Sequence, residues 1–356
     1  MYCLNEKMDD FYRFSYLLNT LMGFASAVLT AIHCVGFKIK YFVLLYIIGI
    51  FYLPKEFVGR KFGLFKLFRF SDIPRQDNRY CIITGGTTGI GAEVTTHLLS
   101  LGMNVIIGSS KLDEKFLKDL QKKYPDLISI WHLDLSSMDS VQKFAKKYLK
   151  KNYPLHLLIL NAGIMFAPYE ITENGYEKHF AVNYLGHCLL TKLLLKKLEA
   201  SGSEEKFARI INVSSSCHFA GKINFDDIQS SQVYSPYFCY AQSKVAQVMF
   251  TYSLQHYISS QNGRITVNSL HPGVVYTNLY QYVFWVNKWT TFLFRTPEEG
   301  AQTVLHAALS PELEKIGGKY LEECTITNSN AYSLSEEHRE LLWNLTWKLL
   351  KPWINT

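Results

Sequence analysis

A glycine-rich turn between an apolar strand and a helix is the feature that most constrains the fold of this chain. Residues 79–84 read as a short buried strand, and the turn Gly85-Gly86-Thr87-Thr88-Gly89-Ile90-Gly91 follows directly, before a helical stretch at residues 92–101. Glycines let the backbone turn tightly and let a pyrophosphate approach the amides at the positive end of a helix dipole. We therefore predict a dinucleotide-binding fold in which Gly85, Gly89 and Gly91 form the phosphate loop.

Further along the chain, short apolar runs alternate with helical stretches. The runs cover residues 104–108, 128–134, 155–161, 208–214 and 264–271. Apolar runs of this length are typical of parallel strands that are buried on both faces. The alternation predicts an α/β, Rossmann-like, doubly wound parallel sheet in a single domain over residues 73–325. Its ligand crevice is expected at the carboxyl ends of the strands.

Tyr240 and Lys244 lie four residues apart in Tyr-Ala-Gln-Ser-Lys, a spacing that places both side chains on one face of a helix. A free phenol has a pKa of about 10, and a fixed cation beside it favours the phenolate. A phenol tuned in this way can move a proton during hydride transfer. Because the same spacing also occurs on ordinary helix surfaces, its meaning depends on the neighbouring motifs.

Several motifs occur in one order and resemble the short-chain dehydrogenase/reductase superfamily over residues 78–325. They are Thr84-Gly85-x-x-x-Gly89-Ile90-Gly91, Asn161-Ala162-Gly163, Ser215, Tyr240-x-x-x-Lys244 and Pro272-Gly273. The resemblance implies that Tyr240 donates or accepts the proton, that Ser215 binds the reacting oxygen, and that Lys244 tunes the phenol and binds the nicotinamide ribose. It also implies that Asn183 holds a water molecule for a proton relay. The alternative for Asn183 is a helix-interior amide with local hydrogen bonds.

The resemblance further implies a bound NAD or NADP. Its ligands would be Gly85, Thr87, Gly89, Ile90, Gly91, Ser109, Ser110, Lys111, Asp134, Asn161, Ala162, Gly163, Tyr240, Lys244, Pro272, Gly273 and Thr277. An acidic residue at the end of the second strand would favour NAD, and a basic one would favour NADP. Ser109, Ser110 and Lys111 could hold a phosphate, whereas Asp113 and Glu114 come slightly late for ribose ligands, so both cofactors stay open.

Three consecutive serines, Ser214, Ser215 and Ser216, complicate the assignment of the substrate-binding hydroxyl. An extended chain cannot point all three into one crevice. The superfamily pattern selects Ser215, and the other two are expected to form hydrogen bonds at the end of the strand.

The amino terminus predicts a membrane anchor within residues 1–72. Residues 14–37 contain no Asp, Glu, Lys or Arg and are long enough to cross a hydrocarbon core of about 30 Å as a helix. A second apolar run at residues 41–53 is too short to span, and is expected to be re-entrant, interfacial or part of a hairpin. A cleavable signal peptide is the alternative, but the first run is long for a signal core and has no clear cleavage site.

Charge is distributed unevenly around these apolar runs. Residues 38–70 hold seven positive and one negative group, whereas residues 1–13 hold two positive and three negative groups. This basic collar contributes most of the formal net charge of +7 and fits anionic lipid headgroups rather than nucleic acid. We expect a catalytic domain that faces the cytosol, at the endoplasmic reticulum membrane. Glycosylation of Asn344, in Asn344-Leu345-Thr346, would indicate a lumenal domain.

The seven cysteines are scattered and lack the paired spacing of metal ligands. The sequence therefore predicts neither a disulfide framework nor a metal site. Cys239 adjoins Tyr240, but a small semi-buried residue is the default interpretation.

Two aromatic segments indicate a lipophilic substrate or surface. Residues 276–296, which the superfamily uses as a lid, hold seven aromatic side chains within fifteen residues, and plain core or a dimer face are the alternatives. Residues 326–356 predict an amphipathic tail that either packs on the domain or contacts lipid. A homodimer is also expected, because members of the superfamily often pair through helices that flank the sheet.

Finer phrases resemble the retinol-dehydrogenase branch and, within it, the polyprenol dehydrogenases. They are Val182-Asn183-Tyr184-Leu185-Gly186-His187, Asp226-Asp227-Ile228-Gln229-Ser230-Ser231, Tyr234-Ser235-Pro236 and Thr296-Pro297-Glu298-Glu299-Gly300. The resemblance implies an oxidoreductase that converts polyprenol to polyprenal and dolichal to dolichol in dolichol synthesis. The alternatives are a retinol or steroid dehydrogenase and, in another class, a membrane-tethered binding protein on an inactive dehydrogenase fold.

Overall fold

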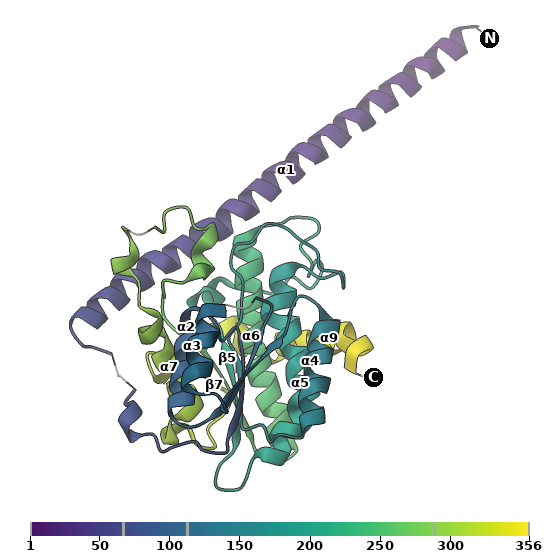
Figure 1. Ribbon diagram of the computed structural model, residues 1–356. Helices are drawn as coiled ribbons and strands as arrows, with labels where there is room; N and C mark the ends of the chain where they lie inside the picture. The colour runs from purple at the N-terminus through teal and green to yellow at the C-terminus, as the bar shows by residue number, and fades with distance from the viewer. Residues whose placement is uncertain (1, 66–67, 112–113, 288, 355–356) are drawn as a thin grey trace.

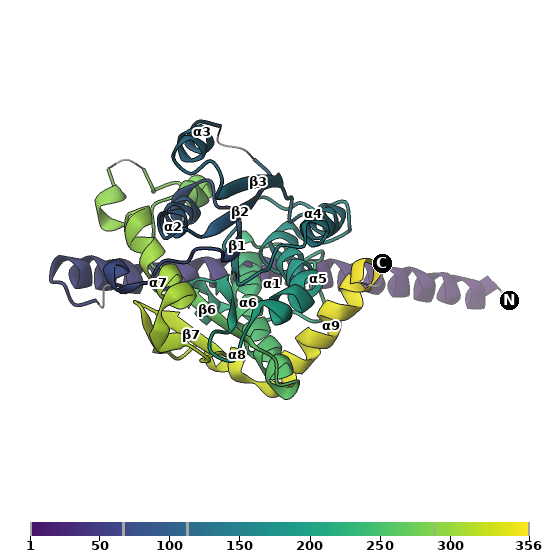
Figure 2. The ribbon, with the colours of Figure 1, turned by 60° about the horizontal axis from the view of Figure 1, so that its bottom comes forward.

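The computed structural model describes residues 2–65, 68–111, 114–287 and 289–354, and within them the side chains from residue 31 onward except 71, 114 and 115. In this part of the chain, eight strands form one sheet in the order β3-β2-β1-β4-β5-β6-β7-β8 (Figure 2). The strands are β1 (Tyr80–Thr84), β2 (Asn104–Ser109), β3 (Ile128–His132), β4 (Leu157–Leu160), β5 (Ala208–Val213), β6 (Ile265–His271), β7 (Lys319–Glu322) and β8 (Thr325–Thr327).

The first six strands lie within the apolar runs or extend them by one residue, and the pairing is parallel from β3 to β7. The predicted Rossmann-like fold is therefore confirmed. β7 and β8 are additional, and β8 pairs antiparallel at the edge of the sheet.

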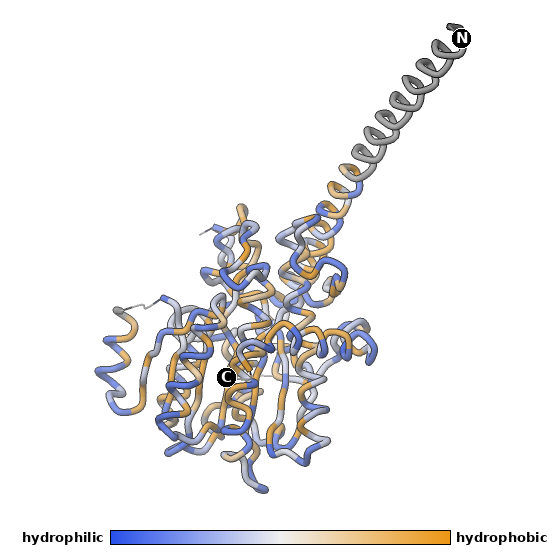
Figure 3. Tube along the Cα trace, turned by 90° about the vertical axis from the view of Figure 1, so that its right-hand side faces the viewer, coloured by the Kyte–Doolittle hydropathy of each residue, from blue (hydrophilic) through white to orange (hydrophobic). Residues whose placement is uncertain are grey.

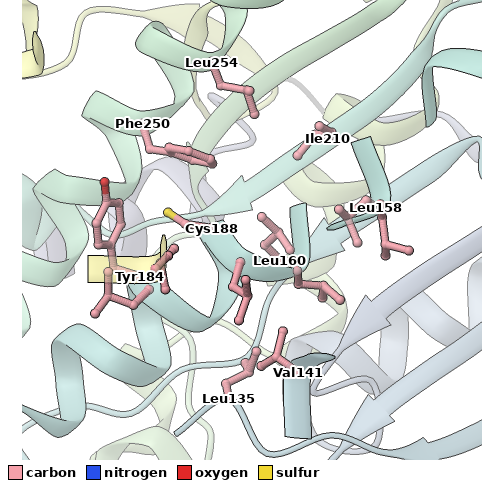
Figure 4. Packing of buried hydrophobic residues seen from close by; sticks show 14 of the residues in the cluster. Leu135, Val141, Leu158, Leu160, Tyr184, Cys188, Ile210, Phe250 and Leu254 are labelled. Carbon is pink, nitrogen blue, oxygen red and sulfur yellow. The ribbon is translucent and has the colours of Figure 1, made fainter. Parts of the chain in front are cut away.

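Helices cover both faces of the sheet (Figure 2). One face carries α2 (Gly89–Ser100), α3 (Glu114–Lys123) and α7 (Pro297–Leu309), and the other carries α4 (Met138–Lys151), α5 (Gly186–Ser201) and α6 (Pro236–Ser260). Because strand side chains alternate between faces, Leu158 and Ile210 pack toward α5 and α6, while Ile159 and Ile211 pack toward α2 and α7. Figure 4 shows the first of these two cores, in which Leu158, Leu160 and Ile210 face Cys188 and Phe250. The connecting segments include η1 (Phe70–Asp72), the π-helical η2 (Phe180–Leu185), η3 (Ser216–Ala220), η4 (Asn278–Tyr282), η5 (Thr291–Leu293) and η6 (Pro311–Leu313).

The C-terminal segment belongs to the domain rather than forming a separate tail. After α8 (Ala331–Leu334), helix α9 (Glu336–Ile354) packs on α4, α5 and α6. Leu342 and Leu350 are buried in the core, and Trp343 stacks on Phe250 with 6.0 Å between ring centroids. The expected tail boundary at residue 326 falls inside β8. The alternative of lipid contact gives way to packing, because α5 and α6 offer α9 an apolar surface of their own domain.

Helix α1 (Tyr2–Lys61) runs without interruption for 60 residues, or about 90 Å (Figure 1). It thus covers both apolar runs, and the expected hairpin or re-entrant turn between them does not form. The linking residues Lys38, Ile39 and Lys40 include no helix breaker, so propagation through them is favourable. Residues Ala31–Lys61 are long and apolar enough to cross a membrane. Most side chains of the expected span at residues 14–37 lie outside the described part.

The C-terminal half of α1 packs on the α/β domain, and the rest projects beyond it (Figure 1). Tyr41, Leu45 and Tyr52 are buried there against α6 and the end of the sheet. Apolar residues predominate along this part of the helix, as the orange segments of Figure 3 show. The segment predicted to be interfacial therefore covers the end of the sheet at which the predicted motif residues lie.

Candidate active site

A cavity of about 660 Å³ opens at the carboxyl ends of β1, β4, β5 and β6. Each of these strands ends in a predicted motif, so the topology brings together residues that are far apart in the sequence. Of the predicted site residues, those that line the cavity are Gly85, Gly89, Ile90, Gly91, Asn161, Ala162, Gly163, Ser215, Tyr240, Lys244, Pro272, Gly273 and Thr277. Apolar residues of α1 and of segment 276–296 complete its walls.

The glycine turn after β1 has the shape of a phosphate cradle. Gly85 and Gly89 have positive φ angles of 65° and 54°, which side-chain-bearing residues rarely adopt. A Cβ atom at Gly91 would lie 2.1 Å from the carbonyl oxygen of Gly85. Thr88, at the N-cap of α2, makes no side-chain cap, so the first amides of the helix are left for another acceptor. These features fit the pyrophosphate of a dinucleotide.

Asn161 fixes the cradle from the neighbouring strand. Its Nδ2 donates hydrogen bonds to the carbonyl oxygens of Thr84 at 3.0 Å and of Gly85 at 3.1 Å. The amides of Asn161 and Ala162 both donate to Thr84 Oγ1 at 3.0 Å. The loop Asn161-Ala162-Gly163 therefore sets the shape of the turn.

The buried His187 side chain links the end of β1 to the π-helical turn η2. Its Nδ1 lies 3.0 Å from the carbonyl oxygen of Asn183, which can only accept, so Nδ1 carries the proton and Nε2 accepts from Thr84 Oγ1 at 2.9 Å. Burial lowers the pKa of His187 to about 3 and keeps the ring neutral. The sequence phrase containing His187 gave no indication of this structural role.

Tyr240 projects from α6 into the base of the cavity. The helix begins at Pro236, after Ser235, whose hydroxyl accepts a hydrogen bond from the amide of Phe238. Phe166 meets the Tyr240 ring edge-on at 5.4 Å. Burial raises the pKa of the Tyr240 phenol, and a hydrogen bond with Ser215 partly opposes that rise. The phenol is therefore neutral in the structure.

Ser214, Ser215 and Ser216 all line the cavity, and the first two have different hydrogen-bond partners. Ser214 Oγ donates to the carbonyl oxygen of Lys244 at 2.9 Å and so joins β5 to α6. Ser215 Oγ accepts from the amide of Cys217 at 3.2 Å and lies within hydrogen-bonding reach of Tyr240. The geometry thus singles out Ser215 as the hydroxyl beside the phenol.

Lys244 lies below Tyr240, with Nζ 5.7 Å from the centroid of the phenol ring. Its ammonium donates to the carbonyl oxygen of Val213 and to Gln247 Oε1, both at 3.0 Å. Burial lowers the pKa of Lys244 to about 7. The sequence interpretation, in which a fixed cation favours the phenolate, is therefore incomplete: both groups are desolvated, and desolvation disfavours the charged form of each.

Asn183 lies in the π-helical turn η2 behind Gly163. Its Oδ1 accepts from the amide of Ile164 at 2.9 Å, and its Nδ2 donates to the Ile164 carbonyl at 3.0 Å and to Ser243 Oγ at 2.9 Å. The side-chain amide thus uses both of its N–H donors within the protein. These partners are 19 and 60 positions away, so the side chain holds the loop after β4 against α6 and does not make the local bonds of the helix-interior alternative. The relay role of Asn183 stays a prediction.

Five predicted cofactor residues do not line the cavity. Thr87 is buried, and its neighbour Thr88 lines the cavity instead. Ser109, Ser110, Lys111 and Asp134 lie at or just beyond the ends of β2 and β3, outside the cavity wall. Asp134 Oδ1 accepts a hydrogen bond from the amide of Ser136 at 2.9 Å. Asp113 lies outside the described residues.

Several cavity residues carry no signal in the sequence motifs. Phe166 has a φ of 54°, an unusual angle for a bulky residue, and supports Tyr240 from the side. Cys217 lines the cavity beside Ser215. Cys239 is buried, and its thiol donates a hydrogen bond to Ser230 Oγ. Burial raises the pKa of Cys217 to about 11, so it is a neutral thiol.

This combination of a phosphate cradle, a buried phenol, a serine and a lysine at the carboxyl edge of a parallel sheet defines a nicotinamide-dependent oxidoreductase site. Comparison with known proteins agrees with that class. The family described as short chain dehydrogenase matches residues 79–285. The chain belongs to the short-chain dehydrogenase/reductase family.

Similar proteins extend the comparison. Over 279 residues, the chain is 43% identical to polyprenol dehydrogenase of Homo sapiens, covering 76% of this chain and 84% of that protein. It is 39% identical to retinol dehydrogenase 12 of Homo sapiens, covering 76% and 85% of the two chains. The crystal structure of an uncharacterized protein from Mycobacterium paratuberculosis matches with a TM-score of 0.65 at 27% identity, over 80% of this chain and 98% of that one. The protein is thus a short-chain dehydrogenase/reductase enzyme of a family that uses NAD or NADP.

Proposed function

We propose that this enzyme interconverts the alcohol and aldehyde forms of a long isoprenoid lipid, oxidising polyprenol to polyprenal and reducing dolichal to dolichol. The observation that carries this proposal is the cavity itself, in which Tyr240, Ser215 and Lys244 form a polar base beneath walls of apolar side chains. Such a cavity suits a substrate with one reactive polar end and a hydrocarbon body. The similarity to polyprenol dehydrogenases supports the same substrate class.

Each residue at the base has a defined task in this reaction. In the reductive direction, the neutral Tyr240 phenol donates its proton to the carbonyl oxygen as the carbon receives hydride. Ser215 orients that oxygen, and Lys244 lies next to the phenol as the nearest cation. In the oxidative direction the same steps run in reverse: the substrate O–H bond breaks, its proton passes to the Tyr240 phenolate, and the carbon gives up hydride. The chemistry supplied by a bound nicotinamide is the exchange of hydride with the substrate carbon. Gly85, Gly89, Gly91 and Asn161 would hold its dinucleotide.

We further propose that α1 anchors the enzyme in the endoplasmic reticulum membrane, with the catalytic domain on the cytosolic side. The apolar stretch Ala31–Lys61 and the basic collar support this orientation. Asn344, in the sequon at residues 344–346, is exposed on α9 and would be open to glycosylation in a lumenal domain. A glycosylated chain in cells would contradict the cytosolic orientation.

The decisive experiment follows nicotinamide absorbance with the full-length chain in detergent. The substrates are polyprenol, dolichal, retinol and a sterol, each with NAD and with NADP in the appropriate redox form. We expect turnover with the isoprenoid substrates, and a loss of about 10²–10⁴-fold in Tyr240→Phe, the usual contribution of a positioned proton donor.

Tyr252→Phe is the matched control, because Tyr252 lies on the same helix but outside the cavity lining. Its hydroxyl forms a hydrogen bond of 2.7 Å with Ser329 Oγ. It should retain activity. Preference for retinol or a sterol would favour the alternative substrate classes. Unchanged turnover in Tyr240→Phe would refute the mechanism, and absence of turnover with every substrate would favour a binding protein on this fold.

A further inference from the structure

Helix α1 is a wall of the active site as well as an anchor. Six of its residues line the cavity: Leu45, Tyr46, Ile48, Gly49, Ile50 and Leu53. Leu45 is buried in one cluster with Tyr240 and Val283, so α1 joins the α6 side of the cavity to the 276–296 segment. The hydrocarbon part of a substrate bound at Tyr240 would therefore contact the anchor helix directly.

The lining residues of α1 form two adjacent stripes. Leu45 and Ile48 lie on the face toward the domain, where Leu45 is 5% exposed and Tyr52, which does not line the cavity, is 8% exposed. Tyr46, Gly49, Ile50 and Leu53 follow at helical spacing along the edge of that face. Ile50 lines the cavity although it is 70% exposed. The cavity therefore opens to the outside along this edge of α1.

Gly49 makes the gap in this edge. A Cβ atom added to Gly49 would meet no heavy atom within 4 Å, so the space beside it is open. Glycine inside a helix costs roughly 0.5–1 kcal/mol relative to alanine, so helix stability does not account for it. The flanking residues Tyr46, Ile50 and Leu53 are large, and Gly49 alone on this edge leaves room beside the backbone.

Exposed apolar side chains lie on α1 and on segment 276–296, the two elements that complete the walls of the cavity. Ile39, Ile47 and Phe51 are 56%, 56% and 64% exposed on α1. Phe284 and Trp289, from the segment 276–296, are 84% and 87% exposed. Exposed apolar side chains on a helix long enough to span a membrane are suited to contact with lipid acyl chains.

We propose that the opening at Gly49 is the passage through which the hydrocarbon chain of the substrate leaves the cavity toward the bilayer, so that Gly49 determines which chain lengths react. This inference rests on the proposed isoprenoid substrate. The cavity of about 660 Å³ is of the size that encloses an ordinary small ligand, roughly 300–1,000 Å³. A long polyprenol places its alcohol end beside Tyr240, and the rest of its chain passes over Gly49.

The test compares a short isoprenoid alcohol, geraniol, with a long polyprenol in the Gly49→Phe variant of the full-length chain. A phenyl ring at this position fills the passage but leaves the base of the cavity unchanged. We expect kcat/KM for the long alcohol to fall at least roughly tenfold, the scale of a steric misfit in an apolar pocket, with geraniol within about twofold of wild type. Gly36→Phe is the matched control, because Gly36 is also unobstructed on α1 but does not line the cavity. It should affect neither substrate.

A measurement on the unmodified chain covers the case in which Gly49→Phe does not fold. A photoreactive group at the tail of a long isoprenoid alcohol should label the α1 peptide at residues 41–53, and unlabelled polyprenol should compete with it. Labelling confined to other peptides, or a Gly49→Phe variant that treats both alcohols as wild type does, would overturn the passage at Gly49. Wild-type chain that turns over neither alcohol would instead overturn the proposed function.

Discussion

A buried ion cluster fastens α1 to the loops at the mouth of the active site, and Glu56 is at its centre. Glu56 is 2% exposed, and its Oε2 accepts hydrogen bonds from Arg295 Nε and from the amide of Val274, both at 2.8 Å. His271 Nε2 lies 3.5 Å from Oε1. Arg295 in turn pairs with Glu323. The substitution Glu56→Gln keeps the shape of the side chain but leaves the Arg295 charge without this buried partner.

The expected cost follows from burial. Removing one partner of a buried ion pair typically costs roughly 3–5 kcal/mol, because the remaining charge stays desolvated. An amide oxygen can still accept one hydrogen bond, so we expect the free energy of unfolding to fall by about 3 kcal/mol. For a domain of this size, that loss lowers Tm by about 6–12 °C.

Thermal unfolding followed by fluorescence measures this shift, and Glu204→Gln is the matched control. Glu204 also pairs with an arginine, Arg264, at 3.0 Å, but its side chain is 72% exposed, and an exposed pair contributes about 0–1 kcal/mol. A shift in Glu56→Gln no larger than that in Glu204→Gln would show that α1 is not held by this cluster.

Three further substitutions test the site. Burial lowers the pKa of Lys244 to about 7, against about 10.4 when unfolded. The unfolded chain then binds more protons between these values, so the free energy of unfolding should rise with pH across that window. Thermal melts from about pH 7 to 10 should show this rise in the wild type and a smaller one in Lys244→Met. His187 has a pKa of about 3 in the folded chain and about 6.5 in the unfolded chain, so the free energy of unfolding should fall as the pH falls through that window. Urea titrations of His187→Gln should not show this decrease. In Gly91→Ala, the new Cβ would lie 2.1 Å from the oxygen of Gly85, so nucleotide binding measured by fluorescence should be lost, whereas Gly36→Ala should bind normally.

Local patterns were sufficient to predict the first six strands and to bring most of the predicted site residues to one cavity. These six strands are apolar runs of four to seven residues, and the motif residues follow their carboxyl ends, so topology alone brings Gly85, Asn161 and Ser215 together. The edge strands β7 and β8 escaped prediction because they are short and, unlike the four-residue β4, contain no continuous apolar run. The hydrogen bonds of a side chain such as Asn183 depend on distant residues. Its partner Ser243 is 60 positions away, and no local pattern specifies that pairing.

The contribution of α1 could not be predicted for the same reason. Its contacts join residues that are far apart in the sequence, as in the hydrogen bond of 2.9 Å from Tyr52 to Glu322, 270 positions away. From the sequence, residues 41–53 were only an apolar run too short to span a membrane. As a helix, residues 41–53 place one face against the cavity, while the other face remains apolar and exposed.

The position of helix α1 and the geometry of the active site are therefore coupled in this fold. A flexible tether would carry no buried carboxylate, whereas Glu56 binds the Val274 amide directly after the Pro272-Gly273 turn of the cofactor site. Arg60 likewise donates to the carbonyl oxygens of Phe294 at 2.7 Å and Phe292 at 2.8 Å, in the segment that covers the cavity. A displacement of α1 relative to the domain must act on these loops, because the helix and the loops share hydrogen bonds. In the membrane-bound enzyme that we propose, the position of α1 would thus bear on how the mouth of the active site is held.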